Sequence, residues 1–156
     1  LGLAQADEKG NINVSKIGPK IAGCGGFINI TQNTHKVVFC GTFTAKGLRE
    51  EIRDGKLVIT HEGAVQKFID KVGQITFSAE YAHKHNQQVM FITERCVFVL
   101  TDKGLVLTEI APGVDLQKDI LDQMEFVPHI AENLKTMDER LFRDEPMGLA
   151  QDIFEQ

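Results

Sequence analysis

The chain has 156 residues, of which 42% are hydrophobic and 25% are charged, and its formal net charge is −5. This length is sufficient for one domain with a core of its own. The negative net charge argues against a protein that binds duplex nucleic acid. No apolar run is long enough for a transmembrane helix. We therefore expect no nucleic-acid partner and no membrane association.

The three cysteines, Cys24, Cys40 and Cys96, are odd in number and widely spaced. This usage favours reduced thiols in the cytoplasm over a disulfide framework. Residues 1–7 have the composition expected at the end of a buried strand, and the first residue is not Met. A signal peptide needs a basic start and a longer apolar segment. We therefore expect a fragment whose upstream part is absent.

The first distinctive segment contains three glycines within four residues, Gly23, Gly25 and Gly26, with Cys24 between the first two. Glycine permits positive φ and close approach of another group to the backbone. A short helix is expected directly afterwards, over residues 27–33. Free amides at its start suit an anion or a developing oxyanion. A tight loop whose glycines only satisfy a turn is the alternative, and the spacing fits neither a dinucleotide fingerprint nor a P-loop.

Asn13 is a candidate site residue because it lies just ahead of this loop, although a turn-capping amide is the alternative interpretation. Further along, Asp54-Gly55 predicts a hairpin over residues 46–63. Residues 64–72 have a helical period that an extended segment would also accommodate. Strands are predicted over residues 11–14, 36–42, 74–78, 89–100 and 105–110, with a break at Glu94-Arg95.

The C-terminal part is predicted to be helical. Asp115 caps a helix that runs to about residue 124. Residues 130–142 form an amphipathic helix, and residues after 146 are a short helix or are disordered. The histidines are isolated or, at His83 and His85, point to opposite sides, so we predict no metal site.

Six separated blocks of the sequence carry a family resemblance, namely residues 1–7, 10–16, 23–33, 37–45, 92–98 and 104–113. In this order along the chain, they resemble the C-terminal, β-type half of family I CoA-transferases. The resemblance extends over roughly residues 1–145 and is strongest to bacterial acetate/propionate CoA-transferases. The resemblance implies an α/β fold, namely an open CoA-transferase-type sheet domain with flanking helices that is incomplete here. Residues 1–127 would belong to the β-type domain, and 128–156 would be a helical extension or tail.

The resemblance also implies a ping-pong reaction in which a glutamate carboxylate attacks an acyl-CoA thioester and later carries CoA as a glutamyl thioester. Gly26 would supply an oxyanion-hole amide, and Gly23, Cys24, Gly25 and Gly26 would help to bind CoA. Asn13 would orient the substrate or the glutamate. The resemblance places the nucleophilic glutamate upstream, outside this chain.

The glutamates within the chain are not expected to replace the nucleophilic glutamate. Glu94 and Glu109 fall in a strand region of the family and are interpreted as structural, and Glu62 and Glu80 match no motif. The implied partners are acyl-CoA, short-chain carboxylic acids, the missing N-terminal half and further copies of the protein. Coenzyme A acts as substrate and covalent intermediate, with no permanently bound cofactor.

The loop cations Lys16, Lys20 and Lys46 could meet CoA phosphates, although solvated side chains are the alternative for each. Two other functions remain open. One is a non-catalytic module that binds CoA or a similar anion. The other is an isomerase or hydrolase of the same broad fold, which would need an acid/base pair near the glycine loop.

Overall fold

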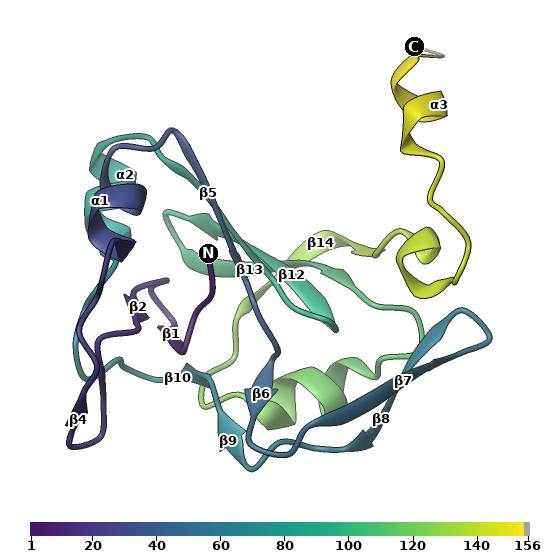
Figure 1. Cartoon of the computed structure of the whole chain (residues 1–156), viewed down its shortest axis with the longest axis horizontal. Coiled ribbons are helices and arrows are strands. Elements are labelled where there is room, and N and C mark those ends of the chain that lie inside the picture. The colour runs from purple at the N-terminus through teal and green to yellow at the C-terminus, as the bar shows by residue number, and fades with distance from the viewer. Residues whose placement is uncertain (155–156) are drawn as a thin grey trace.

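The computed structural model describes residues 1–154 and is organised around a mixed five-stranded sheet (Figure 1). The middle three strands form an antiparallel meander, and each outer strand pairs in parallel with its neighbour. The strand order is β14 (His129–Thr136), β13 (Gly104–Ile110), β12 (Cys96–Thr101), β11 (Gln88–Ile92) and β5 (Lys36–Cys40).

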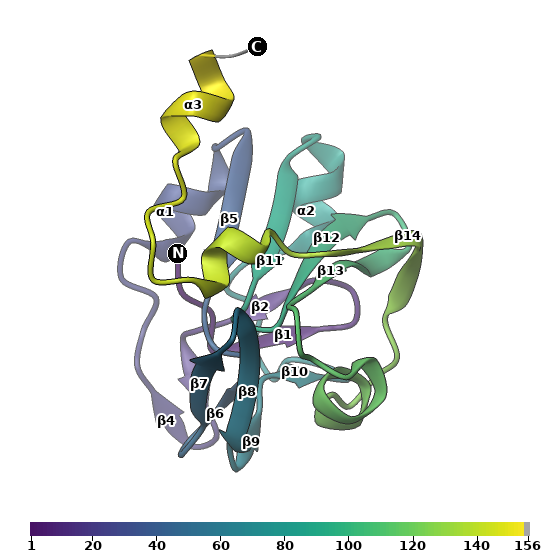
Figure 2. The ribbon, with the colours of Figure 1, turned by 90° about the vertical axis from the view of Figure 1, so that its right-hand side faces the viewer.

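The remaining strands form four smaller sheets of two or three strands each (Figure 2). One has three strands, β10 (Phe68–Ile69), β1 (Gln5–Asp7) and β2 (Ile12–Asn13). The two-stranded pairs are β3 (Lys16–Ile17) with β4 (Lys20–Ile21), β6 (Thr44–Ala45) with β9 (Val65–Gln66), and β7 (Arg49–Arg53) with β8 (Lys56–His61).

The helices are short. Two of them, α1 (Phe27–Gln32) and α2 (Ala79–Lys84), precede β5 and β11 and lie at the same end of the molecule (Figures 1 and 2). Among residues 1–154, no helix combines the length and apolar character needed to cross a membrane. The others are η1 (Leu116–Ile120), η2 (Leu121–Gln123), η3 (Glu139–Phe142) and α3 (Leu149–Phe154).

Aromatic side chains fill the main core, between the five-stranded sheet and the β10–β1–β2 sheet. Phe39 is fully buried and has Phe27, Phe77 and Phe91 within 5.7 Å between ring centroids. On β12, Phe98 faces this core, whereas the adjacent Val97 belongs to a second, smaller cluster. This alternation is the two-residue period of a strand, and it lets β12 bury both of its faces.

The predicted hairpin over residues 46–63 is confirmed as β7 and β8. Asp54 and Gly55 have φ values of 51° and 73°, as a tight turn between two antiparallel strands requires. The helical alternative for residues 64–72 is wrong, because β9 and β10 make this segment extended. The break at Glu94-Arg95 and the cap at Asp115, whose side chain accepts from the Lys118 amide, are confirmed.

The helix predicted over residues 130–142 is wrong for most of its length. Residues 129–136 form β14, and only η3 is helical. The apolar residues recur with a helical period, but the free edge of β13 offers backbone partners that a lone, mostly exposed helix would lack. The predicted strand over residues 74–78 reduces to an isolated bridge between Phe77 and Ile12. The division of the chain at residue 127 remains a prediction.

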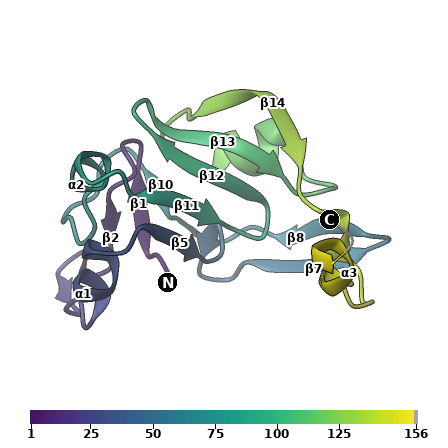
Figure 3. The same ribbon diagram turned by 90° about the horizontal axis from the view of Figure 1, so that it is seen from above.

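The first residues are strand-like, as the sequence indicates. The Leu1 amino group donates to the Val38 carbonyl at 2.9 Å, and the Leu1 carbonyl accepts from the Cys40 amide at 2.7 Å. Gly2 bridges to Cys40 in parallel, so the chain enters alongside β5 (Figure 3). The C-terminal helix α3 does not pack in the same way, because it projects away from the sheets (Figure 1).

Candidate functional site

The glycine-rich loop leaves the β3–β4 hairpin and leads into α1. The Ser15 carbonyl accepts from the amides of Ala22 and Gly23 at 2.9 and 3.2 Å, which anchors the start of the loop. Gly23 and Gly25 have φ values of 79° and 51°. A Cβ at either position would meet no atom within 4 Å, so it is backbone conformation, and not crowding, that requires glycine there.

Gly26 differs from these two glycines. Its φ is −83°, which any residue adopts, and a Cβ there would come only into ordinary contact with Ile30, at 3.6 Å. Within residues 1–154, neither conformation nor packing therefore demands glycine at this position. Close approach of a group from outside the chain is a physical reason for the missing side chain.

Unused backbone donors gather at this loop. The Cys24 carbonyl accepts from the Phe27 amide at 3.0 Å, and the Gly26 carbonyl accepts from the Ile30 amide at 3.0 Å. The amides of Cys24, Gly25 and Gly26 donate to no acceptor in the described part of the chain. Three unpaired amides on an exposed loop can serve an anion or the oxyanion of a tetrahedral intermediate.

Asn13 is fully buried, and its amide is occupied by the turn between β2 and β3. Its Oδ1 accepts from the amides of Ser15 and Lys16, both at 3.1 Å. Its Nδ2 donates to Gln5 Oε1 at 2.8 Å and to the Lys16 carbonyl at 2.6 Å. The structure thus favours the turn-capping role, through which Asn13 supports the approach to the glycine loop.

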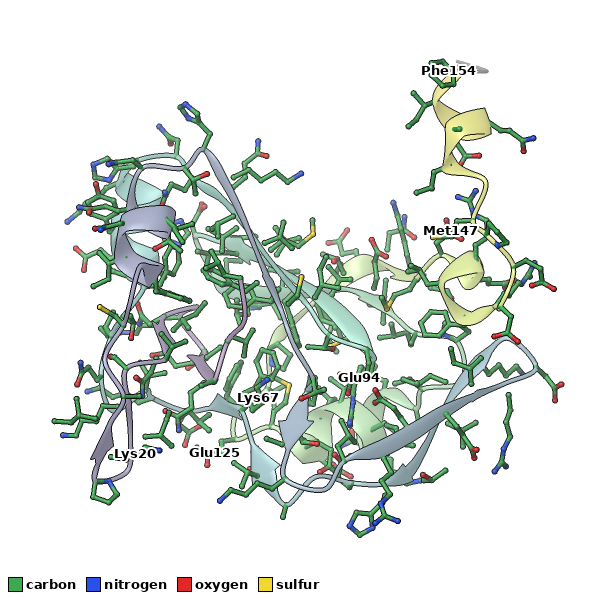
Figure 4. The ribbon with its side chains drawn as sticks, viewed as in Figure 1. Lys20, Lys67, Glu94, Glu125, Met147 and Phe154 are labelled. Atoms are coloured by element: carbon green, nitrogen blue, oxygen red, sulfur yellow. The ribbon has the colours of Figure 1, made fainter. Side chains whose placement is uncertain are left out.

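The three candidate cations do not form one cluster. Lys16 and Lys20 are exposed on the β3–β4 hairpin, just ahead of the glycine loop, and Figure 4 shows Lys20 at the outer tip of this hairpin. Lys46 follows β6, which lies apart from β4 in Figure 1. Only the first two precede the glycine loop directly in the sequence.

A buried arginine is the main polar feature that the sequence did not reveal. Arg95 is fully buried and donates from Nε to Glu94 at 2.8 Å and from both terminal nitrogens to Glu62 at 2.8 and 3.2 Å. It also donates to the Asp119 carbonyl at 2.8 Å and lies 4.9 Å from the ring centroid of Phe43. The interruption of two apolar runs by Glu94-Arg95 was its one sequence signal.

The two carboxylates of this network are structural. Burial favours the neutral form of Glu62, but hydrogen bonds from Arg95, Thr44 and the Gly63 amide outweigh it, so the pKa of Glu62 lies below its usual value. Glu94 accepts from Arg95 and, at 2.8 Å, from the Phe43 amide. Both carboxylates thus neutralise the buried guanidinium, which makes them poor nucleophiles.

Lys67, between β9 and β10, is a second buried cation. Its side chain donates from Nζ to the Thr42 carbonyl at 2.7 Å, and the residue is only 7% exposed. Burial lowers the pKa of Lys67, and the negative charge of Glu94 acts in the opposite direction. The sequence signal, a lysine inside an otherwise apolar extended segment, was too weak to identify it.

In the described residues, no three His, Cys, Asp or Glu side chains come together as a metal-binding group would require. The three cysteines are free thiols, and Cys24 is half-buried at the edge of the core. Burial raises the pKa of the Cys96 thiol well above its usual value, which keeps it protonated.

Comparison with known proteins finds similarity to CoA-transferases along nearly the whole chain. No family model matches it. It is 55% identical over 154 residues to the caffeate CoA-transferase of Acetobacterium woodii, a match that covers 96% of this chain and 29% of that protein. It is also 55% identical over 148 residues to the acetate CoA-transferase YdiF of Escherichia coli K12, covering 95% of this chain and 28% of YdiF. The chain thus spans less than a third of the curated relatives it matches.

Solved structures agree with this result. A thioester complex of YdiF acyl-CoA transferase from E. coli O157:H7 with CoA superposes with a TM-score of 0.93 at 54% identity, over 94% of this chain and 29% of that one. Glutaconate CoA-transferase from Acidaminococcus fermentans shares the fold, with a TM-score of 0.64 at 15% identity, over 97% of this chain and 55% of that one. The fold is therefore the CoA-transferase type of α/β fold that the resemblance implied. Along nearly its whole length, the chain is thus similar to the C-terminal part of CoA-transferases.

Proposed function

We propose that the protein to which this chain belongs transfers CoA from a short-chain acyl-CoA to a carboxylic acid. The observation that carries this proposal is the 55% identity to two CoA-transferases along nearly the whole chain. Acetyl-, propionyl- and acetoacetyl-CoA are the donors that the sequence resemblance favours. The amides exposed at Gly25 and Gly26 match the need of such a reaction for oxyanion donors.

The proposed chemistry begins with a glutamate carboxylate outside this chain. Its oxygen attacks the thioester carbon, the C–S bond breaks, and an acyl-glutamyl anhydride and CoA thiolate form. The thiolate then attacks the glutamyl carbon and displaces the first carboxylate, which leaves a glutamyl-CoA thioester. An incoming carboxylate reverses these steps and leaves as the new acyl-CoA. Each attack passes through a tetrahedral oxyanion, which the Gly26 amide would stabilise.

The surroundings of the loop define the other proposed roles. Gly23, Cys24, Gly25 and Gly26 would contact CoA, and the exposed lysines Lys16 and Lys20 on the preceding hairpin would offer positive charge to its phosphates. Asn13 would act indirectly, by holding the turn that precedes the loop. The free thiols support a reducing compartment, and we propose that the protein is cytoplasmic and forms a homo-oligomer.

The test is a transfer assay on the full-length protein with acetyl-CoA and propionate. We expect propionyl-CoA to form and covalently bound CoA to appear on the protein. A protein that binds CoA but produces no new thioester would instead fit the alternative, a non-catalytic CoA- or anion-binding module. The isomerase or hydrolase alternative has no support in the glycine loop, where the described residues place no acid/base pair.

A further inference from the structure

The backbone around Lys67 is held in the core, and its ammonium group donates to one backbone carbonyl. The backbone carbonyl of Lys67 accepts from the Ala6 amide at 2.8 Å, and the next residue, Phe68, packs between Phe43 and Phe98 in the core. The chain on the C-terminal side of Lys67 is therefore anchored in the core. This directs the side chain of Lys67 toward Thr42, at the end of β5.

The ammonium group is incompletely paired. It has three N–H donors, and one of them reaches the Thr42 carbonyl. Among residues 1–154, no carboxylate lies within 4.0 Å of Nζ. Glu94, the carboxylate whose charge acts on Lys67, uses its two oxygens for Arg95 and the Phe43 amide. A buried cation without a counter-ion is costly, so its retention calls for a partner.

The cation lies near the carboxyl ends of two parallel strands. Thr42 follows the carboxyl end of β5, and Glu94 follows the carboxyl end of the parallel neighbour β11. Open α/β sheets bind ligands beyond the carboxyl ends of their strands. Gly41 also leaves room there, because a Cβ at this residue would lie 3.0 Å from Nζ. In Figure 4, Lys67 and Glu94 both lie in the central part of the molecule.

We propose that the Lys67 ammonium group binds a carboxylate that comes from outside this chain. A carboxylate suits the site because its two oxygens accept the remaining N–H groups and its charge neutralises the cation. It has two possible sources, the acid substrate or a carboxylate side chain from the rest of the protein. This proposal rests on the proposed transferase function, in which both sources occur.

The experiment uses the full-length protein with Lys67→Met, which keeps the apolar stem and removes the charge. Lys71→Met, at an exposed lysine four residues further on, is the matched control. Two quantities are measured with propionyl-CoA as donor. The first is the KM for acetate in the complete reaction. The second is the rate at which covalently bound CoA appears on the protein when no acid is added.

The two sources predict different results. If Lys67 binds the acid substrate, Lys67→Met raises the KM for acetate about tenfold or more, the order expected for loss of a charge-assisted hydrogen bond, and leaves the rate without acid near its wild-type value. If Lys67 binds a carboxylate of the protein, the rate without acid falls by a similar factor, and the KM for acetate changes by less than about twofold. Values within about twofold of wild type for both quantities overturn the proposal, provided that Lys67→Met is folded.

Gly41→Ala provides a second test that keeps the charge. Its new methyl group pushes the flexible end of Lys67 by a few tenths of an ångström. We expect it to change the same quantity as Lys67→Met in the same direction. If Lys67→Met does not fold, Gly41→Ala decides, and wild-type values for it refute the site. Absence of transfer by the wild-type protein would refute the proposed function itself, which is a different result from an active wild type with an unaffected variant.

Discussion

Substitution of Gly26 by proline removes one proposed oxyanion donor with little other change. Proline has no amide hydrogen and fixes φ near −65°, and Gly26 already has a φ of −83°. The amide of Gly26 donates to no acceptor in residues 1–154, so no hydrogen bond of the fold is lost. The space beside the residue is open, with Ile30 at 3.6 Å from a Cβ. The loss should therefore fall on catalysis and not on stability.

The expected magnitude follows from the role of a single donor. Removal of one preorganised oxyanion-hole donor lowers kcat by about 10²- to 10³-fold, or about 3–4 kcal/mol of transition-state stabilisation. We expect Gly26→Pro in the full-length protein to lower kcat for transfer from acetyl-CoA to propionate by about 10²-fold or more. The KM for acetyl-CoA should change far less, because the donor acts mainly on the tetrahedral intermediate.

Gly26→Ala is the matched control, because alanine keeps the amide hydrogen and adds only a methyl group. We expect a smaller loss for Gly26→Ala than for Gly26→Pro, with equal melting temperatures for both variants. A kcat for Gly26→Pro within about threefold of wild type would refute the oxyanion role of this amide. Equal losses in the two variants would point instead to the space beside Gly26 as the required feature.

Three further predictions concern the buried charges and the extent of the site. Arg95→Met should lower the free energy of unfolding by about 3 kcal/mol, because it leaves Glu94 buried without its cation. Arg53→Met, at an exposed ion pair, should lower it by less than about 1 kcal/mol. Equal effects of the two substitutions in thermal unfolding would contradict this prediction. The pKa of Glu62 is lowered on folding, so its contribution to stability is complete above its unfolded pKa and is lost as the pH falls through its folded pKa. Glu62→Gln should therefore flatten the acid limb of the plot of melting temperature against pH, and an unchanged limb would disprove this linkage. Finally, residues 1–156 alone should show no transfer from acetyl-CoA to propionate, and turnover by them would mean that the nucleophile lies within this chain.

Local sequence signals predicted the parts of the fold that depend on local chemistry. Asp54-Gly55 defined a hairpin turn because two successive positive φ values are difficult for other residue pairs. The glycine loop was recognised for a similar reason, since Gly23 and Gly25 need positive φ. The conformational argument does not extend to Gly26, whose assignment rested on family resemblance alone.

Features that depend on distant partners were not predictable. Residues 129–136 have a helical period, and only the position of β13 beside them makes them a strand. Arg95 and Glu62 are 33 positions apart in the sequence, so their ion pair has no local signature. Lys67 and Thr42 are 25 positions apart, so their hydrogen bond has no local signature either. Asn13 was recognised as notable, but the three hydrogen bonds that its amide makes to the turn and the fourth to Gln5 became visible only in three dimensions.

The most direct test of the proposed function is the intact mass of the full-length protein after reaction with acetyl-CoA in the absence of an acceptor acid. We predict that the mass rises by that of CoA less one water, because a glutamyl-CoA thioester retains CoA through a bond that survives denaturation. Addition of propionate should return the mass to its starting value and release propionyl-CoA. A mass that stays unchanged, with CoA lost on denaturation, would contradict the covalent mechanism and leave the glycine loop as a binding site only.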